Sequence, residues 1–153
     1  MDLKSKHIMV VDDDEDDRKL FCRALNQVSQ DIACLRASNG KDALEYLGDA
    51  KNSVPEIIFL DINMPVMTGW EFLTKIKRDS RMKSIPIIIF STSSNQRDIN
   101  IAYDLGAASY CVKPDEPGEL KKMLDLVVQH IDHNFKSFLS SDSASIFFHA
   151  PTI

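Results

Sequence analysis

Four short polar motifs in this sequence carry side chains that could do chemistry together, and each follows an apolar run. They are Asp12-Asp13-Asp14, Asp61-Ile62-Asn63, Ser91-Thr92 and Lys113-Pro114. Carboxylates gathered at one place raise one another's pKa unless a cation lies between them. Carboxylate and carbonyl oxygens are the ligands that Mg²⁺ prefers, so a shared location for these motifs predicts a divalent cation site.

The same residue types suit the transfer of a phosphoryl group. A carboxylate beside a divalent cation can attack phosphorus, because the cation screens the negative charge of both the nucleophile and the incoming phosphate. The hydroxyl of Ser91 and the ammonium of Lys113 could then donate hydrogen bonds to the phosphoryl oxygens. The product would be an acyl phosphate held in a polar cradle.

The elements that must position these motifs alternate along the chain. Short β-rich apolar runs occur at residues 8–11, 32–37, 56–60, 85–90 and 109–112, and apolar residues recur at helical spacing between and after them. Runs that are apolar throughout are typical of parallel strands covered on both faces by helices. The pattern predicts a doubly wound, three-layer α/β fold, whose ligands bind outside the carboxyl ends of the strands.

Composition and charge narrow the class of protein. The chain has 153 residues, a formal net charge of −5, 44% hydrophobic residues and 27% charged residues. These values are typical of a single globular domain, and the lack of Lys/Arg-rich runs argues against direct binding of nucleic acid. Since the apolar runs are too short to span a bilayer, we expect no membrane contact and a cytoplasmic location.

The three cysteines give no sign of a metal site or a redox motif. Cys22, Cys34 and Cys111 are odd in number, far apart and embedded in apolar stretches, with no Cys-x-x-Cys pair. We therefore predict that all three are reduced core residues.

The ordered motifs resemble those of the receiver domains of two-component signalling. The motifs concerned are Val10-Val11-Asp12-Asp13, Leu60-Asp61-Ile62-Asn63-Met64-Pro65 with Gly69, Phe90-Ser91 and Tyr110-Cys111-Val112-Lys113-Pro114. The resemblance covers roughly residues 6–133. It implies a flavodoxin-like fold, with five parallel strands in the order 2-1-3-4-5, and a receiver domain at residues 1–133 that stands alone without an output domain.

The resemblance implies a role for each acidic residue near the first and third strands. By this resemblance, Asp61 stands at the position of the phosphate acceptor of the family. The side chains of Asp13 and Asp61, with the backbone carbonyl of Asn63, are implied to bind Mg²⁺ or Mn²⁺. Asp12 is implied to be the second residue of the acidic pocket.

The two later motifs are implied to report the phosphorylation state. Ser91 stands where the family has its switch hydroxyl, and Tyr110 where it has an aromatic residue that changes rotamer on activation. Lys113 is implied to pair with the phosphate, with a cis peptide bond between it and Pro114.

These implied roles give a functional expectation and one alternative. We expect a sensor histidine kinase or a histidine phosphotransfer protein to donate a phosphoryl group to Asp61, which switches a surface that binds a downstream protein. An aspartyl phosphohydrolase would need a second carboxylate where Asn63 stands, so we expect no enzyme beyond self-phosphorylation from small donors and autodephosphorylation. The alternative is a phosphorylation-independent interaction module with the same fold.

The C-terminal tail, residues 134–153, falls outside this pattern. It mixes Ser and Asp with several Phe residues and is more apolar than a flexible tail usually is. The tail is either disordered or docked, and a docked tail would cover the last helix or bridge the two copies of a homodimer.

Overall fold

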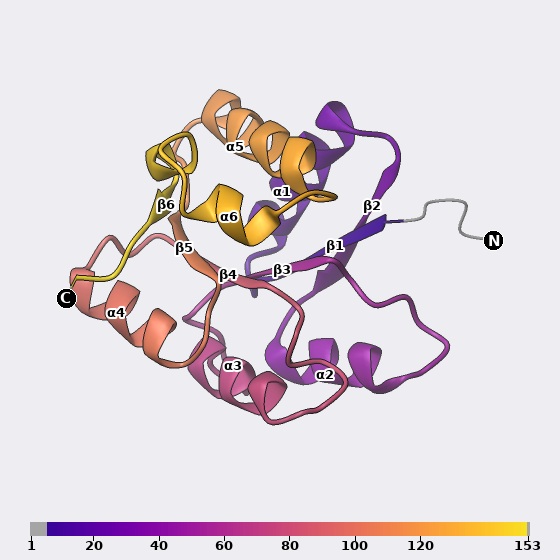
Figure 1. Ribbon diagram of the computed structural model, residues 1–153. Helices are drawn as coiled ribbons and strands as arrows, with labels where there is room; N and C mark the ends of the chain where they lie inside the picture. The colour runs from indigo at the N-terminus through magenta and orange to yellow at the C-terminus, as the bar shows by residue number, and fades with distance from the viewer. Residues whose placement is uncertain (1–5, 153) are drawn as a thin grey trace.

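The computed structural model describes residues 6–152 and has helices on both sides of one sheet (Figure 1). The strands are β1 (Lys6–Val11), β2 (Ile32–Ala37), β3 (Ile57–Leu60), β4 (Ile87–Ser91), β5 (Ser109–Val112) and β6 (Phe148–His149). The helices are α1 (Glu15–Val28), α2 (Gly40–Gly48), α3 (Gly69–Lys77), α4 (Gln96–Asp104), α5 (Pro117–His130) and α6 (Phe135–Leu139), with a 3₁₀ turn η1 (Ala144–Ile146). No helix within residues 6–152 is both long and apolar enough to cross a membrane.

The sheet confirms the predicted fold class and adds a strand that the sequence did not predict. Its order is β2-β1-β3-β4-β5-β6, and the first five strands are parallel. The sixth, β6, pairs antiparallel with β5. In Figure 1, α1, α5 and α6 lie on one face of the sheet, and α2, α3 and α4 lie on the other.

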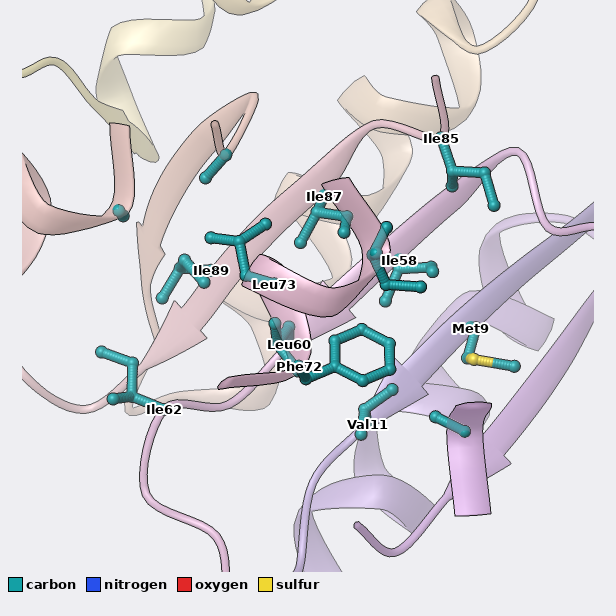
Figure 2. Packing of buried hydrophobic residues seen from close by; sticks show 14 of the residues in the cluster. Met9, Val11, Ile58, Leu60, Ile62, Phe72, Leu73, Ile85, Ile87 and Ile89 are labelled. Atoms are coloured by element: carbon teal, nitrogen blue, oxygen red, sulfur yellow. The ribbon is translucent and has the colours of Figure 1, made fainter. Parts of the chain in front are cut away.

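Two hydrophobic cores, one on each face, hold these layers together. Successive residues of a strand point to opposite faces; in β3, Ile58 and Leu60 therefore enter one core while Ile57 and Phe59 enter the other. Figure 2 shows the first core, where Phe72 of α3 lies among apolar side chains of β1, β3 and β4. Since all of β3 is buried, the polar residue that follows it is delivered to the sheet edge from a rigid strand.

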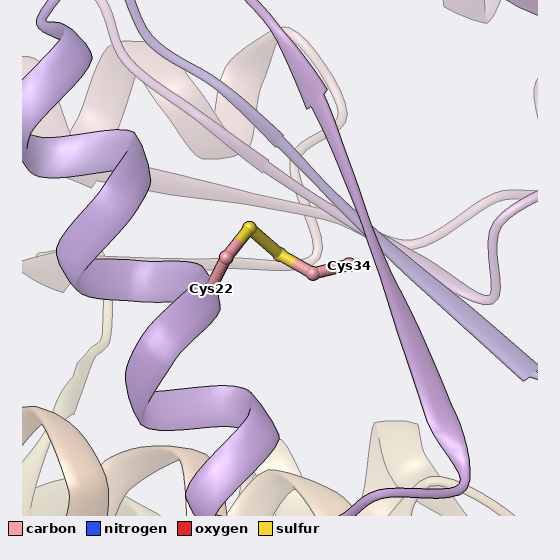
Figure 3. The surroundings of a disulfide bond; sticks show 2 residues. All are labelled: Cys22 and Cys34. Carbon is pink, nitrogen blue, oxygen red and sulfur yellow. A yellow bond between two sulfur atoms is a disulfide. The ribbon is translucent and has the colours of Figure 1, made fainter.

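The prediction that all cysteines are reduced is wrong for two of them. Cys22 of α1 and Cys34 of β2 form a disulfide, with their Cα atoms 5.5 Å apart (Figure 3). Because α1 packs across the edge strand β2, the fold brings together two residues whose sequence spacing shows no motif. Cys111 remains a free, buried thiol, and burial raises its pKa to about 12.

The tail packs on the domain through residue 152. Asn134 adopts a left-handed conformation with φ of 52°, a region that Asn tolerates, and turns the chain from α5 into α6. Phe138, Ala144 and Phe148 are buried in the same core as α1 and α5. The buried part of the tail therefore lies against α5, the last helix before the tail.

Candidate functional site

The acidic site lies at the carboxyl ends of β1 and β3. These strands pair directly, so Asp12 and Asp13 after β1 lie next to Asp61 after β3. One carboxylate oxygen from each of the three residues lies within 4.8 Å of the others. Asp12 is 1% exposed and Asp61 is 8% exposed, whereas Asp13 is open to solvent. The arrangement is one open carboxylate beside two buried ones.

Backbone amides hold the two buried carboxylates in place. The amide of Asp14 donates to Oδ1 of Asp12 at 3.0 Å, and the amide of Ile62 donates to Oδ1 of Asp61 at 2.9 Å. Asn63 follows in the loop after β3, with its side chain exposed. Each buried carboxylate therefore keeps one oxygen fixed by the backbone and a second oxygen for another partner.

Burial raises the pKa of the carboxylates in this cluster, because the ionised form loses its hydration. The pKa of Asp61 is raised to about 6, chiefly by desolvation, with the charges of Asp12 and Asp13 adding to the effect and Lys113 opposing it. Desolvation also raises the pKa of Asp12. The sequence predicted raised pKa values from mutual repulsion, but the removal of water is the larger cause. A divalent cation with oxygen preference fits these ligands and would stabilise their ionised forms.

Lys113 lies beside the acidic cluster and pairs with two carboxylates. Its Nζ lies 2.6 Å from Oδ2 of Asp12 and 2.9 Å from Oδ2 of Asp17, and its side chain is 12% exposed. Burial alone would lower the pKa of Lys113, but hydrogen bonds to Asp12 and Asp17 outweigh it and raise the pKa above its usual value. The side chain is therefore an ammonium, and within residues 6–152 it has no ion pair with Asp61.

Sequence reasoning missed the contact of Asp17 with Lys113. From the sequence alone, the acidic run Asp14-Glu15-Asp16-Asp17 is expected to form a solvated helix terminus. That description fits Asp16, which is exposed, but Asp17 turns toward Lys113. The signal that could have found it is position: α1 starts three residues after Asp12, so its first turn must lie over the end of β1.

The implied cis peptide bond is absent, and the bond between Lys113 and Pro114 is trans. A bond before proline favours trans by only about 0.5–1 kcal/mol, so the surrounding contacts decide the isomer. With this bond trans, the amide of Lys113 donates to the carbonyl of Ser91 at 2.7 Å. The ammonium of the same residue is paired with Asp12.

Ser91 and Tyr110 converge on the loop after β4. Ser91 ends β4 and is 1% exposed, and its Oγ accepts a hydrogen bond from the amide of Ser93 at 3.1 Å. The ring of Tyr110 is fully buried, and its hydroxyl donates to the carbonyl of Ser93 at 2.8 Å. The two residues are thus linked through Ser93, with Tyr110 in an inward orientation. Burial also raises the pKa of the Tyr110 phenol.

Taken together, the structure brings Asp12, Asp13, Asp61 and Lys113 into one polar cluster, and it places Ser91 at the same edge of the sheet. The edge is common to them because β4 pairs with β3 and β5 pairs with β4. To receive and hold a phosphoryl group, a site needs a nucleophilic carboxylate, a cation site, a hydroxyl donor and an ammonium.

Comparison with known proteins gives consistent matches over most of the chain. A family model described as the response regulator receiver domain matches residues 8–125. The two-component response regulator ORR5 of Oryza sativa subsp. japonica is 34% identical over 123 residues, which are 80% of this chain and 89% of that protein.

Two solved structures are similar over about the same region. The phosphorylated cyanobacterial phytochrome response regulator RcpA superposes with a TM-score of 0.76 at 31% identity, covering 84% of this chain and 94% of that one. The Mn²⁺-bound form of response regulator Rcp1 gives a TM-score of 0.73 at 28% identity, covering 84% and 96%.

Proposed function

This chain belongs to the receiver-domain family of response regulators, and from that premise we propose that it is a phosphorylation switch whose acceptor is Asp61. The observation that carries the proposal is the position of Asp61. Its carboxylate forms one cluster with those of Asp12 and Asp13, and it is close enough to the Lys113 ammonium for that charge to lower its pKa.

The reaction transfers one phosphoryl group between side chains. A carboxylate oxygen of Asp61 attacks the phosphorus of a phosphohistidine on a histidine kinase or a phosphotransfer protein. The new bond joins this oxygen to phosphorus, the nitrogen–phosphorus bond breaks, and its electron pair returns to the imidazole of the donor. The products are an aspartyl phosphate and a free histidine.

The chain's own residues prepare this step by charge and position. The side chains of Asp12, Asp13 and Asp61, with the backbone carbonyl of Asn63, would hold Mg²⁺ or Mn²⁺. When bound, such a cation screens the negative charge that the carboxylates and the phosphoryl group bring together. Asp61 must be ionised to attack. Although its pKa is raised to about 6, the carboxyl group is still mostly charged near neutral pH. Lys113 supplies an ammonium for the phosphoryl oxygens.

The response is a change of binding surface. A phosphoryl group on Asp61 offers oxygens that accept a hydrogen bond from the hydroxyl of Ser91, whose oxygen itself accepts one from the amide of Ser93. Movement of Ser91 and Ser93 would disturb the partner of the Tyr110 hydroxyl. We propose that Tyr110 then reorients and alters the face formed by α4, β5 and α5, to which a downstream protein in the cytoplasm binds.

No turnover of an external substrate is part of this proposal. The chain would act on itself, by taking phosphate from a kinase or a small donor and by losing it to water. The second candidate is a constitutive interaction module with the same fold. The acidic cluster and Lys113 favour the switch, because an interaction module has no need of buried carboxylates with raised pKa values.

The test is the intact mass of the chain after incubation with Mg²⁺ and acetyl phosphate. We expect the native chain to gain one phosphoryl group that is lost in base, and Asp61→Asn to gain none. Asp49→Asn, which removes an exposed carboxylate at the C-terminal end of α2 and outside the acidic cluster, is the matched control and should be phosphorylated like the native chain. If the native chain gains no phosphoryl group from acetyl phosphate or from a phosphohistidine donor, the interaction module is the better description.

A further inference from the structure

We infer that Asp17 is a positioning residue that restrains Lys113 before phosphorylation and is the partner that Lys113 releases when a phosphoryl group arrives. The inference rests on the proposed function and deepens it. It concerns how fast the acceptor is phosphorylated, because a Lys113 ammonium drawn toward Asp17 must move before it can contact the incoming group.

The ammonium of Lys113 is divided between two carboxylates of different character. Its three N–H groups can make three hydrogen bonds, and two of them go to Asp12 at 2.6 Å and Asp17 at 2.9 Å. The side chain of Asp12 is 1% exposed, whereas that of Asp17 is 37% exposed. Lys113 is therefore held by one buried partner and one partly solvated partner.

The place of Asp17 is fixed by the start of α1. Asp14 caps this helix by accepting a hydrogen bond from the amide of Asp17 at 3.0 Å. Arg18, the next residue, donates from its guanidinium to the backbone carbonyl of Asp12 at 2.7 Å. These two contacts tie the first turn of α1 to the end of β1, so the Asp17 carboxylate is held where it meets Lys113.

Desolvation decides which carboxylate gives way. If Lys113 left Asp12, a buried carboxylate would lose a hydrogen-bonded cationic partner that water does not replace, which is costly even beside a bound metal ion. If it leaves Asp17 instead, the carboxylate turns to water that already reaches it, and the loss is that of a partly exposed ion pair, which is smaller. Lys113 therefore exchanges the Asp17 carboxylate for a phosphoryl oxygen while Asp12 keeps its contact.

This exchange makes Asp17 a competitor of the phosphoryl group. The contact of Lys113 with the phosphoryl oxygens strengthens as charge develops in the transition state, and any energy spent on leaving Asp17 adds to the barrier. Asp17→Asn keeps the size of the side chain and removes its charge. We expect this variant to be phosphorylated by acetyl phosphate about two- to five-fold faster, which is the fold-change equivalent of a surface ion pair.

Asp16→Asn is a close control for this measurement. Asp16 lies on the same turn of α1, is exposed, and has no ion pair with any residue that the structure describes. Its substitution makes the same change in net charge and in the charge at the helix terminus. Any acceleration common to both variants therefore reflects weaker repulsion of the anionic donor and not release of Lys113.

The experiment follows the intact mass over time with Mg²⁺ and acetyl phosphate for the native chain, Asp17→Asn, Asp17→Glu and Asp16→Asn. We expect Asp17→Asn alone to be accelerated beyond the control, and Asp17→Glu, which keeps the charge, to return toward the native rate. In a Lys113→Gln background, Asp17→Asn should have no effect beyond that of Asp16→Asn. This loss of the effect is what a purely structural role of Asp17 would not produce.

Three outcomes would overturn the inference. They are equal rates for Asp17→Asn and Asp16→Asn, a slower rate for Asp17→Asn, and an acceleration that persists without Lys113. Failure of the proposed function has a different signature, since the native chain would then take no phosphoryl group or Asp61→Asn would still take one. Circular dichroism of each variant checks that the fold is retained.

Discussion

Gly69 lies directly against the backbone of the proposed acceptor, Asp61. A Cβ atom placed on Gly69 would lie 2.3 Å from the carbonyl oxygen of Asp61 and 2.8 Å from the Cα of Ile62. The amide of Gly69 donates to the carbonyl of Ile62 at 2.9 Å, which closes the loop between β3 and α3. Only a residue without a side chain allows this loop to pack so tightly behind the acidic cluster.

Gly69→Ala is therefore expected to destabilise the protein and to disturb the acceptor. The added methyl group meets backbone and not a flexible side chain, so the loop must shift, at a cost of about 1–3 kcal/mol. Urea unfolding should show this loss, and phosphorylation by acetyl phosphate should slow. Gly118→Ala is the control, because a Cβ at Gly118 meets nothing within 4 Å; if both variants lose equal stability, the close approach at Gly69 is not the cause.

The raised pKa of Asp61 predicts how stability changes with pH in the absence of metal. Its pKa is about 6 in the folded chain and near 3.8 when unperturbed. Between these values the folded state holds a proton that the unfolded state releases, so stability falls as the pH rises from about 4 to 6 and stays lower above that.

Asp61→Asn should remove this dependence. At pH 8, with a chelator present, we expect the variant to unfold with a free energy higher by about 1–3 kcal/mol, since one pKa unit corresponds to about 1.4 kcal/mol. The gap to the native chain should close below about pH 4, where both side chains are neutral. Denaturant unfolding between about pH 4 and 8 measures this difference in the free energy of unfolding. A difference that does not vary with pH would count against the raised pKa.

Addition of Mg²⁺ or Mn²⁺ should stabilise the native chain through the carboxylates of Asp12, Asp13 and Asp61. A ligand that binds only the folded state at one hundred times its Kd adds about 2.7 kcal/mol. Asp13→Asn removes the exposed carboxylate of the cluster and should need a higher metal concentration for the same rise in Tm. Asp16→Asn, outside the cluster, should respond like the native chain, and equal weakening in both variants would contradict the assigned site.

Reduction of the Cys22–Cys34 disulfide should lower stability without changing the fold. The two residues are 12 apart in sequence, and opening a loop of about this size costs about 3 kcal/mol in the chain-entropy estimate. Thermal unfolding with and without a reductant measures the loss. The double variant Cys22→Ser with Cys34→Ser should have nearly the same Tm as the reduced native chain, and a reductant should not change that Tm. If a reductant leaves the Tm of the native chain unchanged as well, no disulfide has formed.

Phe138 is one of the buried residues that hold the tail to the domain. Its ring stacks on the imidazole of His130 at 4.0 Å between centroids, and it packs edge-on against Phe148. Phe138→Ala should lower stability by about 3–5 kcal/mol and loosen β6 from β5. Hydrogen exchange at residues 148–149 would report the release. Ile146→Ala, at a residue that is 72% exposed, should change little.

Local pattern was enough to predict a doubly wound α/β fold, and the resemblance to receiver domains implied the strand order that the sheet has. The β-rich apolar runs became five parallel strands, because a strand buried on both faces must be apolar along its length. The polar motifs met at one edge, because all carboxyl ends of parallel strands lie on the same side. The boundaries were less certain: the run at 85–90 became a strand that starts at Ile87, after Pro86, which has no N–H to donate.

By itself, then, the sequence determined the class of fold, the edge of the sheet that holds the site, and the residue types available there. Only the tertiary structure decided that Cys22 bonds to Cys34, that Asp17 shares the ammonium of Lys113, that the bond before Pro114 is trans, and that the tail adds β6 to β5. The fold class and the edge that holds the site depend on burial, which repeats with the period of each strand and helix. The disulfide, the contact of Asp17 with Lys113, the trans bond and β6 depend on how segments distant in the sequence pack against one another, and no periodic pattern records that packing.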